Sequence, residues 1–164
     1  MSAAPQIVTR TEQPYVAIRA RVTMSELPGL VDRLGEVFGW LGAHQIAPAG
    51  APFFRYDVID MARELEVEAG VPVAVAVAGD GPVSPGVLPA GRYATLTHVG
   101  PYGELAAATS TLLDWAAGQG LTWDMQPGEA GERWGSRLEI YLTDPSQEPD
   151  VSKRETQLAF RLAD

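Results

Sequence analysis

A chain of 164 residues is long enough to form one domain with a sizeable hydrophobic core. Hydrophobic residues make up 46% of the sequence and charged residues 20%, a balance that excludes wholesale disorder. Twelve Lys and Arg residues against 21 Asp and Glu residues give a net charge of −9. This charge argues against nucleic acid as a partner and favours a neutral or cationic ligand.

Cysteine is absent, so the chain has no disulfide, no thiol nucleophile and no Cys-ligated metal site. Residues 1–5 show neither the basic nor the apolar region of a secretory signal. No apolar run approaches the roughly 18 residues of a membrane-spanning helix. We therefore expect a cytoplasmic protein that does not interact with membranes.

The first predicted elements are a strand and a helix. Residues 15–22 alternate between the two faces of a half-buried strand. Ser25 is a suitable helix N-cap, apolar residues then recur at helical spacing over residues 27–41, and Gly42 ends the run.

Two further strands are predicted at residues 53–59 and at residues 65–78, the second interrupted by a glycine and a proline. Glu66 and Glu68 alternate on one face of this second strand. They indicate the solvated side of an edge strand, or negative potential at the mouth of a pocket. The composition of residues 79–86 predicts a loop.

The second half of the chain repeats this order. A strand beginning at Tyr93 precedes a helix over residues 103–119, and strands follow at residues 137–143 and 156–162. Residues 25–27 (SEL) lie 78 positions before residues 103–105 (GEL). The spacing indicates an internal duplication.

We therefore predict an α+β fold in a single domain, residues 1–164, built from duplicated strand–helix–strand–strand modules at about residues 7–80 and 81–164. The strands of such modules form a mainly antiparallel sheet. Both helices are expected on one face of the sheet and a ligand cleft on the other.

Residues 137–145 (RLEIYLTDP) are the most informative segment for function. Alternation places two sets of side chains on opposite faces of this strand. The apolar set should contact the helices: Leu138, Ile140 and Leu142. The other set should face the open side of the sheet: Arg137, Glu139, Tyr141 and Thr143. A shielded carboxylate beside a phenol would attract a cationic ligand. The alternative is a solvated face with Glu139 paired to Arg137 or to a neighbouring strand.

Aromatic residues occur in segments that could line the same space. The candidates are Phe54, Tyr56, Tyr102 and Trp134. An apolar aromatic pocket with one carboxylate suits a flat organic cation, whereas the alternative is that these rings belong to the core. His98 shares a strand face with apolar residues and is expected to be structural. His44 has no partner pattern, so no metal site is expected.

Four short motifs resemble the GyrI-like small-molecule-binding domain, which is also the effector-binding domain of multidrug-responsive transcription regulators. The motifs stand in the family's order over nearly the whole chain: residues 68–73 (EAGVPV), 88–94 (LPAGRYA), 97–102 (THVGPY) and 138–145 (LEIYLTDP). The resemblance implies two fused strand–helix–strand–strand modules with a ligand cleft between them.

In such domains a central glutamate, on the strand before an Asp-Pro turn, meets lipophilic cations among aromatic residues. The resemblance implies that Glu139 is this glutamate, that Tyr141 lies beside it, and that Tyr56 and Trp134 form walls. We expect no metal and no cofactor, and the sequence leaves the oligomeric state open.

The resemblance also implies three functions. The first is a small-molecule binder that senses or sequesters lipophilic, often cationic compounds. The second is a hydrolase of strained, cyclopropane-bearing electrophiles, in which Glu139 and Tyr141 would be catalytic. The third is a gyrase antagonist that competes through its acidic surface. Regulators of this family carry a helix-turn-helix region, which we do not find here, so we expect a stand-alone protein.

Overall fold

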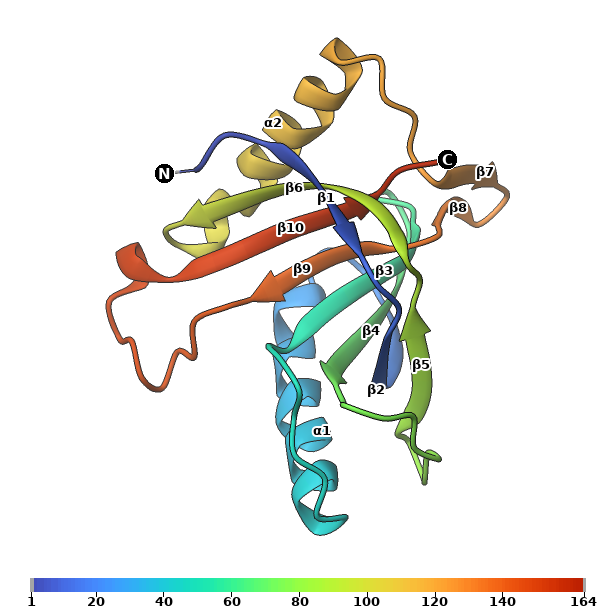
Figure 1. Ribbon diagram of the computed structural model, residues 1–164, viewed down its shortest axis with the longest axis vertical. Helices are drawn as coiled ribbons and strands as arrows, with labels where there is room; N and C mark the ends of the chain where they lie inside the picture. The colour runs from blue at the N-terminus through green and yellow to red at the C-terminus, as the bar shows by residue number, and fades with distance from the viewer. Residues whose placement is uncertain (1, 164) are drawn as a thin grey trace.

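The computed structural model describes residues 2–163, which form two α-helices on one face of a curled antiparallel sheet (Figure 1). The helices are α1 (Val31–Ala43) and α2 (Leu105–Gly118), and short 3-10 turns lie at η1 (Leu27–Leu30), η2 (Tyr102–Glu104) and η3 (Val151–Lys153). The strands are β1 (Gln6–Arg10), β2 (Gln13–Val22), β3 (Phe53–Ile59), β4 (Leu65–Pro72), β5 (Ser84–Leu88), β6 (Gly91–Val99), β7 (Met125–Gly128), β8 (Gly131–Trp134), β9 (Arg137–Tyr141) and β10 (Glu155–Arg161). No helix within residues 2–163 is long and apolar enough to cross a membrane.

The elements with strong periodicity form where the sequence predicts them. The helices and the strands β2, β3, β6, β9 and β10 are confirmed to within a few residues. The predicted strand at residues 65–78 ends at Pro72, and part of the predicted loop at residues 79–86 is the start of β5. Gly70 does not interrupt β4, and a larger residue there would clash, because a Cβ would lie 2.7 Å from the Phe53 ring. The duplication of the two halves stays a prediction.

The sheet order places β9 at the centre of the molecule. The strands run β1-β6-β10-β9-β3-β4-β2-β5, with β7 and β8 as a hairpin attached to β3. Helix α1 packs on β4 and β2, and α2 packs on β6. Both helices lie behind the sheet in Figure 1. The central strands β10, β9 and β3 therefore lie between the two places where helices cover the sheet.

Both faces of the sheet carry a hydrophobic core. On the helix side, Leu34 of α1 and Leu112 of α2 belong to one cluster with side chains from β3, β4, β6 and β10. The curl of the sheet closes a second cluster on the helix-free side: Tyr15, Ala17, Phe53, Leu88, Tyr93, Leu138, Ile140 and Ala159. No helix contributes to this second cluster.

This second core overturns one prediction. Leu138 and Ile140 do not contact the helices, because they face the inside of the curl. Glu139 and Tyr141 consequently lie on the helix side, opposite the side the sequence predicted. Leu142 lies just beyond the end of β9 and is 47% exposed. Alternation correctly separates the two sets of side chains, but apolar character does not identify the helix side when both sides are buried.

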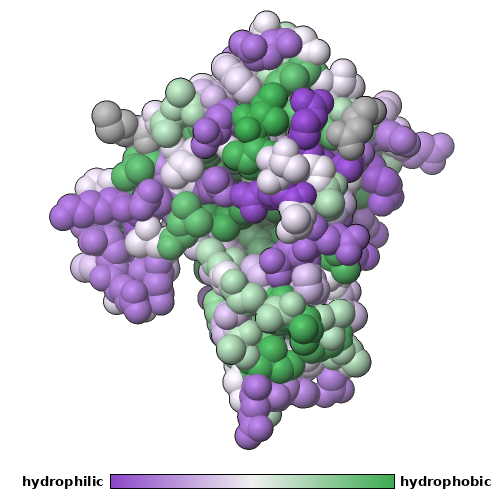
Figure 2. Space-filling model, viewed as in Figure 1, coloured by the Kyte–Doolittle hydropathy of each residue, from purple (hydrophilic) through white to green (hydrophobic). Residues whose placement is uncertain are grey.

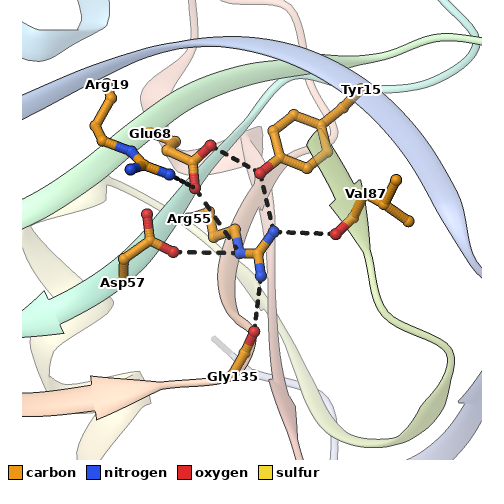
Figure 3. A network of polar contacts seen from close by, with 7 residues as sticks. All are labelled: Tyr15, Arg19, Arg55, Asp57, Glu68, Val87 and Gly135. Atoms are coloured by element: carbon orange, nitrogen blue, oxygen red, sulfur yellow. Dashed lines mark hydrogen bonds and ion pairs between the residues drawn. The ribbon is translucent and has the colours of Figure 1, made fainter. Parts of the chain in front are cut away.

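An ionic cluster on the helix-free side holds the curl together (Figure 3). The Arg55 guanidinium donates to the Tyr15 hydroxyl (2.9 Å), to the Val87 carbonyl (3.1 Å) and to the Gly135 carbonyl (2.8 Å). The Tyr15 hydroxyl in turn donates to Glu68 (2.7 Å). One arginine thus connects β3 to β2, β5 and the segment before β9, and β4 joins through Glu68.

Glu68 itself is buried, so the prediction of a solvated edge for this residue is wrong. Strand β4 lies between β3 and β2, and Glu68 is directly opposite Arg55 on one neighbour and Arg19 on the other. Asp57 also contacts Arg55, with 3.3 Å between Oδ1 and Nε. Two largely buried carboxyl groups therefore lie close together beside Arg55, which is also largely buried, and the exposed Arg19.

Burial and the neighbouring Glu68 carboxyl raise the pKa of Asp57 to about 8. In the unfolded chain this pKa is about 3.9. Between these values the folded protein binds a proton that the unfolded chain does not, so stability falls as pH rises from about 4 to about 8.

We expect Asp57→Asn to remove this part of the pH dependence. A tenfold difference in proton affinity between the folded and unfolded states changes the free energy of unfolding by about 1.4 kcal/mol. Urea unfolding at pH 5 and pH 8.5 will therefore resolve the loss of this pH dependence. Asp114→Asn, at an exposed position on α2, is the matched control. Equal pH dependence in the two variants would contradict the assignment.

Candidate functional site

Glu139 occupies the middle of the central strand β9. Its neighbours across the sheet are Leu158 on β10 and Phe54 on β3, and both belong to the helix-side core. The sheet here lies between the areas covered by α1 and α2. Glu139 as a residue is neither fully buried nor fully exposed.

Two phenols hold the carboxylate in place. The Tyr56 hydroxyl donates to Glu139 Oε1 at 2.9 Å, and the Tyr141 hydroxyl donates to the same oxygen at 2.8 Å. No residue within 2–163 donates a hydrogen bond to Oε2 in this structure. Oε1 thus accepts two hydrogen bonds from the protein, whereas Oε2 accepts none from residues 2–163.

The electrostatics of the three groups follow from their burial. Burial raises the pKa of Glu139, and the hydrogen bonds from Tyr141 and Tyr56 oppose this increase. Burial and the Glu139 charge raise the pKa of both phenols well above the ordinary value. The phenols therefore remain neutral donors at physiological pH.

Aromatic rings surround this carboxylate. The Phe54 and Tyr141 rings meet edge to face with centroids 5.3 Å apart, and Phe54 and Tyr56 do so at 6.5 Å. Tyr102 of η2 contacts Tyr141 at 5.8 Å and is itself 39% exposed. Five of the six predicted ligand-binding residues therefore come together: Phe54, Tyr56, Tyr102, Glu139 and Tyr141.

Trp134 is the sixth, and it lies in a neighbouring aromatic cluster. It is buried against Trp123 (5.7 Å) and Phe160 (5.8 Å). The Arg137 guanidinium lies over both Trp134 and Phe160, at 4.6 Å and 4.5 Å from the ring centroids. Trp134 is thus part of the core beside the site.

Arg137 is the residue that the sequence reasoning undervalued. It lies two positions before Glu139 on the same face of β9. Its charge lowers the pKa of Glu139, although the two side chains form no ion pair among the described residues. Of the alternative pairings for Glu139, the ion pair with Arg137 does not form within residues 2–163, whereas a bond to the neighbouring strand does, from Tyr56 on β3. The sequence did contain a signal for the proximity of Arg137 to Glu139, because residues two positions apart on a strand lie on the same face of the sheet.

The two histidines have structural surroundings. Both ring nitrogens of buried His98 have partners, the Ser2 hydroxyl at 2.7 Å and Glu104 at 2.9 Å. His44 stacks on Trp40 with ring centroids 4.1 Å apart. In the described part of the chain no three His, Asp or Glu side chains lie close enough together to bind a metal ion.

The sequence of residues 3–161 matches the GyrI-like small molecule binding domain family. The match spans nearly the whole chain, and the protein therefore belongs to this family. No curated protein matches the sequence.

Solved structures share the fold. The EcmrR C-terminal domain is 19% identical with a TM-score of 0.76, over 98% of this chain and 97% of that one. In the EcmrR–DNA complex, this chain spans 57% of the longer EcmrR chain, at 20% identity and a TM-score of 0.76. SAV2435, solved with bound tetraphenylphosphonium, is 11% identical with a TM-score of 0.65, over 98% and 94% of the two chains. A hydrolase from Listeria innocua is 12% identical with a TM-score of 0.60, over 97% and 91%.

The two phenol hydrogen bonds make a testable prediction about proton affinity. Removing either bond in Tyr56→Phe or Tyr141→Phe should raise the pKa of Glu139 further, because each bond stabilises the carboxylate. Carbon-detected NMR titration of the Glu139 carboxyl group measures this pKa. Tyr102→Phe keeps both bonds and is the control. An unchanged Glu139 pKa in both test variants would contradict the geometry.

Proposed function

We propose that this protein binds lipophilic, cationic aromatic compounds at Glu139. The observation that carries the proposal is a partly buried carboxylate that is held by two neutral phenols and has no cationic side chain paired to it. A buried charge without an opposite charge is costly, and a cationic ligand would offset that cost.

The surrounding rings support the same class of ligand. Phe54, Tyr56, Tyr102 and Tyr141 offer ring faces and edges beside the carboxylate. A cation over an aromatic face within about 6 Å gains roughly 0.5–2 kcal/mol. Burial of ligand apolar surface adds about 25 cal/mol per Å². Charge would therefore select the ligand, and apolar contact would supply most of the affinity.

Tetraphenylphosphonium is a suitable probe, because SAV2435 was solved with this cation bound. We expect saturable binding by isothermal titration calorimetry, weakened about tenfold or more in Glu139→Gln (about 1.4 kcal/mol). Glu66→Gln is the matched control, because it removes the same charge from a residue paired with Arg21 elsewhere on the sheet. Equal affinities in the wild type and Glu139→Gln would overturn the proposal.

The raised pKa of Glu139 gives the proposal a pH signature. Only the carboxylate attracts a cation, so affinity should be lost as pH falls through this pKa. Affinity measured from pH 8 to pH 4.5 should decline for the wild type and stay flat for Glu139→Gln. A parallel decline in both proteins would place the titrating group elsewhere.

Hydrolysis of strained electrophiles is a second candidate function for the same residues. A carboxylate with a raised pKa is a suitable general base, and a neutral phenol can donate to an oxygen that gains charge. In this reaction Glu139 takes a proton from water as the water oxygen attacks a cyclopropane carbon. The breaking C–C bond delivers its electron pair to a conjugated carbonyl, and Glu139 returns its proton to the oxygen or α-carbon of the resulting enolate, which regenerates the carboxylate.

Mass spectrometry distinguishes the two functions. With a cyclopropane that carries an electron-withdrawing carbonyl group, hydrolysis adds the mass of one water molecule to the substrate. The product should disappear in Glu139→Gln and form more slowly in Tyr141→Phe, whereas Tyr102→Phe should retain activity. An unchanged substrate after long incubation, with tetraphenylphosphonium still bound, would leave ligand binding as the function.

A further inference from the structure

A cavity lies on the other side of the sheet from Glu139. Its volume is about 440 Å³, within the range of small-molecule sites. The floor is formed by apolar side chains of the helix-free core, among them Phe53, Leu88, Tyr93, Leu138 and Ile140. Figure 2 looks onto this side and shows hydrophobic surface set back between polar groups near the middle of the molecule.

Arg10 is the single charged residue among those that line this cavity. Its Nη2 donates to Gln157 Oε1 at 2.6 Å, and its guanidinium lies 5.6 Å from the Tyr93 ring centroid. Its Nε is buried without an acceptor. No Asp or Glu within residues 2–163 is paired with Arg10, although eight other arginines or histidines in this described range have a carboxylate within 4.0 Å.

These observations define a cavity with an apolar floor and one cation on its wall that no carboxylate within residues 2–163 pairs with. Burial lowers the pKa of the Arg10 guanidinium, which reflects the cost of holding this charge without an anion. The planar guanidinium fork matches a carboxylate in two parallel hydrogen bonds. Gln157 fixes the position of the fork over the Tyr93 ring, so the donors that remain can meet a ligand without rearrangement.

We propose that this cavity binds a small amphiphilic carboxylate, with the carboxylate on Arg10 and the apolar part against Phe53, Leu138 and Ile140. A single guanidinium matches one negative charge, which favours a monocarboxylate over a phosphate dianion. The site is independent of the proposed cation site, since the two sets of side chains project from opposite faces of β9.

Methyl NMR with 2-naphthoate and its neutral analogue 2-naphthamide tests the proposal. The Leu138 and Ile140 methyl signals should shift saturably with naphthoate. The amide should bind at least about tenfold more weakly, and Arg10→Gln should weaken naphthoate binding by a similar factor. Arg33→Gln removes the same charge from an exposed position on α1 and should have no effect.

A second variant keeps the test decisive if Arg10→Gln folds poorly. Ala51 lines the cavity, so Ala51→Phe should fill it and abolish naphthoate binding with Arg10 retained. Equal affinity for naphthoate and naphthamide, shifts confined to the Glu139 side, or no saturable binding would each overturn the proposal. Tetraphenylphosphonium binding should survive Ala51→Phe, so failure of one site is distinguishable from failure of the other.

Discussion

The carboxylate of Glu139 lies on the central strand of a sheet whose two faces both carry a hydrophobic core. The rest of the structure depends on how this charged group is stabilised between them. Water reaches it only in part, and no arginine or lysine is paired with it in the described chain. The protein instead stabilises it with two neutral phenols on one oxygen. Such an arrangement leaves the negative charge available while fixing the position of the group.

The curl of the sheet is what permits this arrangement. A flat sheet with helices on one face would leave its other face in water. Here the strands bend so that Tyr15, Phe53 and Tyr93 close a second core, and Arg55 connects the strands that face each other across it. Strand β9 can therefore present a polar, aromatic set of side chains to one face and an apolar set to the other.

Much of this fold follows from sequence, because the helices and long strands have strong periodicity. Alternation also groups Arg137, Glu139 and Tyr141 on one face of β9. It does not show which face meets the helices, since Leu138 and Ile140 are buried just as well inside the curl. Short strands such as β7 (MQPG) contain proline and glycine and have no alternation to detect.

The residues of the candidate site could be predicted from the sequence only in part. Phe54, Tyr56 and Tyr102 could be proposed as aromatic neighbours of Glu139, but the register of β3 against β9 is what brings Phe54 directly opposite it. The contacts of the Trp134 ring with Trp123 and Phe160 are likewise not visible in the sequence. Distances between strands are tertiary information, which a pattern within one strand does not contain.

A crystal structure of the protein grown with tetraphenylphosphonium tests the central claim most directly. The account predicts that the cation lies on the helix side of β9, within about 6 Å of the Tyr56, Tyr102 or Tyr141 rings and beside Glu139. A cation found in the helix-free cavity or away from Glu139, with saturable binding in solution, would contradict it.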